Sequence, residues 1–153
     1  MIFPDLTSTV GGTPLVELGR LAGGLPGRMV AKLEMRNPCA HPRHPEPDGA
    51  AVLSGRPAGT HQMPGIGVGF VPEVLNRAVI DEIVAVTDDD AFEAARRLAR
   101  EEGILAGVSS GAAIHAALGL AARPGAAGTT IVVLLADTGD RYVSSPLMTG
   151  SPG

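Results

Sequence analysis

An ordered alternation of strand and helix signals in the second half of the chain most constrains its fold. Residues 80–86 (IDEIVAV) predict a strand, after which Thr87 begins a helix that ends at Gly103. A short apolar segment at 104–108 leads to a second helix, and residues 130–135 (TIVVLL) predict a buried strand typical of parallel sheets. This alternation indicates an α/β layer.

The two predicted helices differ in their surfaces. In the first, Thr87 and Asp90 have the spacing of a capping box, with Asp in place of the usual Glu. Its charged residues recur at four-residue spacing, which indicates a solvent-exposed face. The second helix, from 112 to about 123, is apolar almost all round and is expected to be buried. We interpret His115 within it as a core histidine.

The first half of the chain is richer in turn-forming residues. Residues 7–18 predict a loop punctuated by Gly and Pro, and residues 29–33 (MVAKL) predict a strand. Residues 39–49 contain three prolines and no periodicity, so we expect an irregular connector there. Residues 71–75 predict a short helical turn.

Composition and charge exclude several classes of function. The 153 residues match one ordinary domain, and with 3% aromatic residues the core must consist of Ala, Val, Ile and Leu. A net charge of −4 gives no basic surface, so neither nucleic acid nor a membrane is an expected partner. No membrane span or signal peptide is visible. Cys39, the single cysteine, excludes an intrachain disulfide and favours a cytoplasmic location.

Two segments have the composition of ligand-binding backbone. Ser109 stands where a strand end meets the start of a helix, so it either caps the helix or offers its hydroxyl to a polar ligand atom. Residues 65–70 (GIGVGF) do not have the G-x-G-x-x-G spacing of a dinucleotide fingerprint, and no strand precedes them. Flexibility or close approach of the backbone is the better interpretation of these glycines.

A metal site is not expected. Cys39, His41 and His44 lie in a proline-rich setting without a second ligand pair. After the last strand, residues 137–141 (DTGDR) occupy the edge where α/β proteins place their sites, but the same residues would suit a solvated turn.

Several longer motifs occur in the order found in one enzyme family. They are GTPLV at 12–16, AKLE at 31–34, AVLSG at 51–55, GIGVGFVPEVLN at 65–76, AREEGILAGVSSGAA at 99–113 and DTGDRY at 137–142. Together they resemble cysteine synthase (O-acetylserine sulfhydrylase), one of the fold-type II enzymes that depend on pyridoxal phosphate.

The resemblance implies an incomplete member of that family. The central loops that bind the substrate carboxylate and the cofactor phosphate have no counterpart, so the expected fold is α/β, a partial three-layer parallel sheet of the fold-type II kind. We expect an N-terminal family segment at 1–38, a junction at 39–49 in place of the missing middle, a C-terminal α/β segment at 50–146 and a tail at 147–153.

The resemblance also assigns roles to individual residues. Ser109 aligns with the serine that hydrogen-bonds the pyridine nitrogen of the cofactor, and Gly65 and Gly67 match a segment that borders the active-site cleft. Arg43 falls near the position of the Schiff-base lysine. Lys32, the only lysine, matches a strand lysine of the family that does not bind the cofactor. No catalytic residue is therefore assigned, and cysteine synthase activity is not expected.

Three alternatives follow. In the first, the chain is a truncated and inactive cysteine synthase homologue. In the second, it is a non-enzymatic partner, either as a homodimer or bound to an intact homologue or to serine acetyltransferase. In the third, the protein is an intact cysteine synthase, and the sequence lacks its middle in error.

Overall fold

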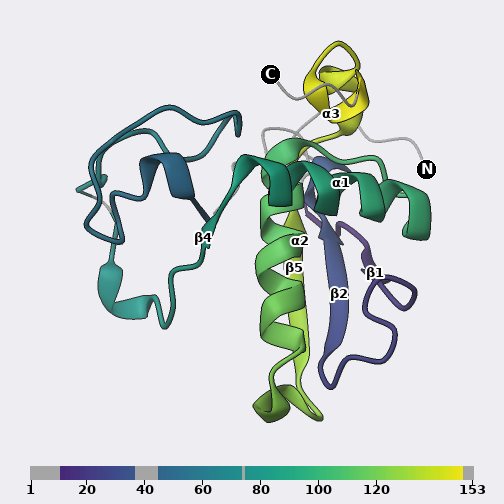
Figure 1. Ribbon diagram of the computed structural model, residues 1–153. Helices are drawn as coiled ribbons and strands as arrows, with labels where there is room; N and C mark the ends of the chain where they lie inside the picture. Colours follow the sequence, from purple (N-terminus) through teal and green to yellow (C-terminus); the bar gives the residue numbers. More distant parts are fainter. Residues whose placement is uncertain (1–10, 37–44, 74, 150–153) are drawn as a thin grey trace.

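Figure 1 shows the computed structural model of the chain, which describes residues 11–36, 45–73 and 75–149. The strands are β1 (Leu15–Glu17), β2 (Arg28–Leu33), β3 (Glu46–Pro47), β4 (Ala85–Val86) and β5 (Thr130–Leu135). The helices are α1 (Asp88–Glu102), α2 (Val108–Ala121) and α3 (Pro146–Thr149). Short 3₁₀ turns lie at η2 (Glu34–Arg36), η3 (Asp48–Ala50), η4 (Arg77–Val79), η5 (Pro124–Ala126) and η6 (Gly139–Tyr142).

The larger sheet has the strand order β1-β2-β5. β2 and β5 run parallel, and their six-residue ladder places Ala31 opposite Val133. β1 pairs with the other edge of β2 and runs antiparallel to it. The sheet is therefore a partial α/β sheet, with a parallel centre and one antiparallel edge strand.

The main core lies between one face of this sheet and the helices. Met29, Ala31 and Val133 on the sheet are at most 4% exposed, and they share a cluster with Leu98 of α1 and Ile114 of α2. α2 packs along β2 and β5, while α1 crosses α2 (Figure 1). Because successive strand residues point to opposite faces, Val132 emerges on the other side, where it is 58% exposed.

The described residues between 45 and 86, which lie in sequence between β2 and α1, extend to one side of the main core (Figure 1). The only strands among these described residues, β3 and β4, form a two-residue parallel ladder. The expected strand at 80–86 is therefore wrong except at Ala85 and Val86. A strand extends only as far as its partner offers hydrogen bonds. Pro47 on β3, which pairs with Val86, has no N–H to donate.

The helix predictions agree well with the structure. Thr87 caps α1 by accepting a hydrogen bond from Asp90 N at 3.2 Å, and Gly103 ends the helix with φ +71°. The second helix was placed too late, because α2 begins at Val108. Its burial is partial, since His115 and Leu120 are partly exposed and Gly119 is exposed.

Other expectations for the backbone were wrong. Within the expected loop at 7–18, residues 15–17 form β1, because β2 supplies hydrogen-bond partners that local sequence does not reveal. The short apolar segment at 104–108 is a connection only as far as Gly107, with an isolated bridge between Ala106 and Thr138, because Val108 already belongs to α2. The expected helical turn at 71–75, by contrast, agrees with a bond of 2.9 Å from Leu75 N to Pro72 O, although Val74 lies outside the described residues, and η4 follows it.

No helix in the described part of the chain is long and apolar enough to cross a membrane.

Candidate functional site

A group of hydrogen-bonded side chains joins the start of α2 to the end of β5. The Ser110 hydroxyl accepts from Ala136 N at 3.2 Å and donates to Asp137 Oδ1 at 3.4 Å, and the Tyr142 hydroxyl donates to Asp137 Oδ2 at 2.6 Å. Burial and the hydrogen bond to Asp137 together raise the pKa of the Tyr142 phenol. Gly107 is required beside this group, because a Cβ there would lie 2.4 Å from Asp137 Oδ1.

Of the residues after β5, some match the interpretation as a site at the sheet edge and others match the interpretation as a solvated turn. Asp137 belongs to the group at the carboxyl edge of the sheet. Asp140 and Arg141 are exposed and belong to a solvated turn. The Thr138 side chain and the backbone N–H of Asp140 hold the pKa of the Asp140 carboxyl below its ordinary value.

Ser109 lies inside the first turn of α2 and does not cap it. Gly107 is the N-cap residue, and no side chain completes the cap. Ser109 is 2% exposed, and within the described residues no hydrogen bond reaches its hydroxyl. Because leaving a buried hydroxyl unpaired costs about 1–3 kcal/mol, this position suits a polar atom supplied from outside the chain.

The glycine-rich segment lies in the region of β3. Gly65, Gly67 and Gly69 all have positive φ, and a Cβ on Gly67 would lie 2.6 Å from Pro47 Cγ. Ile66 packs in the same apolar cluster as Val108, the residue before Ser109. The fold therefore brings the two sequence-predicted site segments to one part of the molecule.

Lys32 is bound away from this region. Its Nζ donates to the Thr13 carbonyl oxygen at 2.8 Å, also contacts the Thr13 hydroxyl, and lies 3.9 Å from Glu34 Oε2. Its neighbours Ala31 and Leu33 face the core on which α2 packs. Because strand residues alternate, the Lys32 side chain leaves the opposite face, and the sheet separates its amine from Ser109.

Some candidates cannot be placed. Arg43, near the expected lysine position, lies outside the described residues, as do Cys39, His41 and His44. Among the residues that the structure describes, no cluster of side chains could hold a metal ion. The interpretation of His115 as a core histidine is wrong, because its side chain is 42% exposed and Nδ1 lies 3.7 Å from Asp90 Oδ1.

Glu46 was missed by the sequence reasoning. The expected irregular connector ends in ordered structure, with Glu46 only 4% exposed on β3. Its carboxylate accepts from Leu53 N, from Ser54 N at 3.0 Å and from the Ser54 hydroxyl at 2.8 Å. Nothing in the proline-rich pattern around it signals a buried carboxylate.

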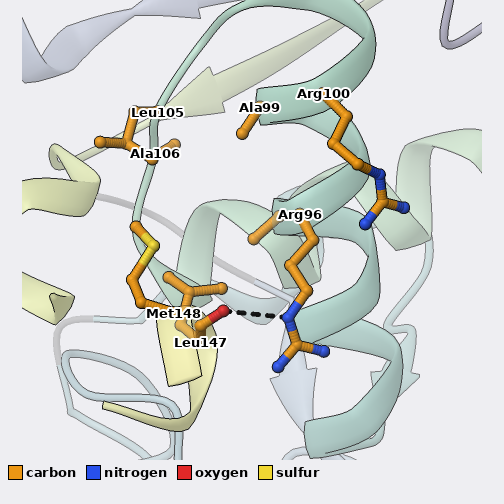
Figure 2. Close-up of a pocket in the computed structure, with 8 residues that line it drawn as sticks. Arg96, Ala99, Arg100, Leu105, Ala106, Leu147 and Met148 are labelled. Carbon is orange, nitrogen blue, oxygen red and sulfur yellow. Dashed lines mark hydrogen bonds between the residues drawn. The ribbon is translucent and has the colours of Figure 1, made fainter. Parts of the chain in front are cut away.

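A cavity of about 210 Å³ lies between α1 and α3 (Figure 2). Arg96 lines it and donates from Nε to Leu147 O at 2.9 Å and from Nη2 to Pro146 O at 2.6 Å. Its guanidinium also lies 5.7 Å from the centre of the Phe92 ring. Since these contacts fix α3 to α1, the cavity is a packing gap beside a structural arginine.

The comparisons with known proteins agree on one family. The family model for "Pyridoxal-phosphate dependent enzyme" matches residues 44–137. Cysteine synthases from Staphylococcus aureus strains Mu50 and N315 are 50% identical over 102 residues, which is 67% of this chain and 33% of each relative. The chain therefore spans about a third of the length of the curated relatives that it matches.

Solved structures give the same fold. Cysteine synthase from Entamoeba histolytica matches with a TM-score of 0.91 at 19% identity, over 100% of this chain and 93% of that chain, which bears on the fold alone. O-ureido-L-serine synthase matches with a TM-score of 0.65 at 42% identity, over 70% of this chain and 34% of that chain. The second match covers only a third of its neighbour, in agreement with a partial sheet of the expected kind.

Proposed function

The chain belongs to the family of pyridoxal-phosphate dependent enzymes, and we propose that it is a truncated cysteine synthase homologue without catalytic activity. The placement of Lys32, the only lysine in the sequence, carries the proposal. The cofactor reacts through a primary amine supplied by the protein. Lys32 is bound to Thr13 and Glu34 on the face of the sheet opposite α2.

The residues present fit one part of a cofactor site and not the other. The Ser109 hydroxyl at the start of α2 is buried, forms no hydrogen bond with any described residue and suits a ring nitrogen. No lysine amine accompanies it, and an arginine such as Arg43 does not replace a Schiff-base lysine, because its guanidinium stays protonated at physiological pH. We therefore derive no catalytic step through the cofactor.

An activity assay tests this proposal directly. The purified chain is incubated with pyridoxal phosphate, O-acetylserine and sulfide, and cysteine is measured against a sample without protein. An intact cysteine synthase is assayed in parallel as the positive control. We expect no cysteine above the blank, and turnover that disappears in Lys32→Ala would refute the proposal.

Borohydride reduction separates specific from nonspecific attachment of the cofactor. After reduction, we expect peptide mapping to find no stoichiometric label on Lys32 and, at most, an adduct at the N-terminal amine. Ser109→Ala should not change that labelling. Stoichiometric label at Lys32 that decreases in Ser109→Ala would show that both residues serve one cofactor site.

A second candidate function, binding to another protein chain, is favoured by the open side of the large sheet. Within the described residues no strand pairs with the outer edge of β5, and Val132 beside that edge is 58% exposed. The strand has no charge or proline to block pairing. The partner would be a second copy, an intact homologue or a serine acetyltransferase.

Co-purification tests this second function. Tagged chain is mixed with an intact cysteine synthase or with serine acetyltransferase, and Val132→Lys is the matched variant. A complex that Val132→Lys abolishes would support a partner role. Insolubility of the chain with neither protein bound would favour an inactive remnant. Resequencing the gene across codons 39–46 tests the alternative of an intact enzyme.

A further inference from the structure

His61 bridges two points of the backbone around the glycine-rich segment. Its Nδ1 lies 3.1 Å from Met63 N, and its Nε2 lies 3.1 Å from the carbonyl oxygen of Gly67. An amide N–H only donates and a carbonyl oxygen only accepts. The two contacts together therefore require the neutral ring with its proton on Nε2.

The segment that this ring spans has little room to rearrange. Gly67 has φ +62°, and a Cβ there would lie 2.6 Å from His61 Nε2 and 2.6 Å from Pro47 Cγ. Its backbone is therefore packed between the imidazole and β3. Met63 and Ile66, whose side chains are at most 8% exposed, anchor the same segment in the core.

We propose that His61 is a proton-sensitive latch, whose bond to Met63 at the start of the glycine-rich segment exists only while its ring is neutral. Protonation of Nδ1 from solvent converts that atom from an acceptor to a donor. Two N–H groups, those of Nδ1 and Met63, then face each other, and the bond to Met63 is lost. This inference goes beyond the proposed function, because it requires neither cofactor nor catalysis.

The charged side chains on β3, on η3 and at the first residue of α1 are acidic, and other partners already engage them. Glu46 on β3 accepts from Leu53 and Ser54, and Asp48 on η3 pairs with Arg56. Asp88, at the start of α1, accepts from Gln62 N at 3.0 Å. Among the described residues none of these carboxylates bonds the ring, so the ring's own proton decides the state of the latch.

Amide exchange at Met63 measures the latch directly, because this N–H is the one that Nδ1 accepts. In His61→Asn the side-chain oxygen can replace Nδ1, whereas in His61→Gln the side-chain amide can replace only Nε2. We expect His61→Asn to keep the protection of the Met63 amide. His61→Gln and His61→Ala should each lose about fivefold, the factor expected for one hydrogen bond.

The dependence on pH provides the second measurement. Exchange is compared at about pH 8 and about pH 5 and is normalised to the intrinsic rate at each pH. The wild-type chain should lose Met63 protection at the lower pH, and His61→Asn should not. His115→Asn, at the other histidine that the structure describes, should behave like wild type.

Two results would overturn the inference. The first is equal Met63 protection in wild type, His61→Asn and His61→Ala at both values of pH. The second is a ring ¹⁵N spectrum of the wild-type chain that places the neutral proton on Nδ1. The spectrum needs no variant, so it decides the matter even if the substitutions unfold the chain.

Discussion

Replacement of Gly111 by Ala should separate the two main helices. Gly111 lies in the first turn of α2, where α2 crosses α1. A Cβ at this position would lie 2.1 Å from the backbone oxygen of Ala91 and 2.8 Å from the Ala95 Cβ. The nearest atom belongs to the backbone of a helix, so it cannot move away as the end of a flexible side chain would.

The contact geometry gives the size of the effect. Restoring normal contact requires α1 and α2 to move apart by about 1 Å, and overpacking of this kind costs about 3 kcal/mol at the upper end of its usual range. Alanine is about 1 kcal/mol better than glycine inside a helix. We therefore expect Gly111→Ala to lower the free energy of unfolding by about 2 kcal/mol.

Gly119→Ala is the matched control, because Gly119 lies in the same helix and a Cβ there would meet nothing within 4 Å. This change should stabilise the chain by about 0.5–1 kcal/mol. Urea unfolding followed by circular dichroism measures both variants. If Gly111→Ala were as stable as Gly119→Ala, the close packing of α1 against α2 inferred here would be wrong.

Two further predictions concern buried polar groups. Glu46→Gln should lower the free energy of unfolding by about 2 kcal/mol, because the hydrogen bonds from Leu53 and Ser54 lose their charged acceptor. Ser54→Ala removes only the hydroxyl contact, so it should lower the free energy of unfolding by less in the same urea assay. Since the folded-state pKa of Tyr142 is raised, its contribution to stability is fully present below about pH 10, the ordinary value, and decreases as the pH rises above it. Tyr142 is the only tyrosine, so phenolate absorbance should appear together with unfolding. Tyr142→Phe should remove this residue's contribution to the loss of stability at alkaline pH. Phenolate formation in the folded chain near pH 10 would contradict the argument.

The candidate site was only partly predictable from the sequence. The motif around Ser109 located the start of a helix. Whether Ser109 caps that helix or keeps a free hydroxyl depended on which residue takes the N-cap position, and in the structure that residue is Gly107. The contact of Tyr142 with Asp137 spans only five residues, yet it forms because η6 turns the chain back toward β5. The bridge from His61 to Gly67 likewise depends on the positive φ angles of Gly65 and Gly67.

What the sequence determined by itself rests on local chemistry. The ends of α1 follow from Thr87 and Gly103, because a cap bond and a left-handed residue involve only near neighbours. A chain with one lysine also limits covalent cofactor chemistry in any fold. The tertiary structure alone decided that Lys32 faces away from α2, that Glu46 is buried and that β1 joins the sheet. Each of these depends on a partner distant in sequence or on the face of a strand, which only packing selects.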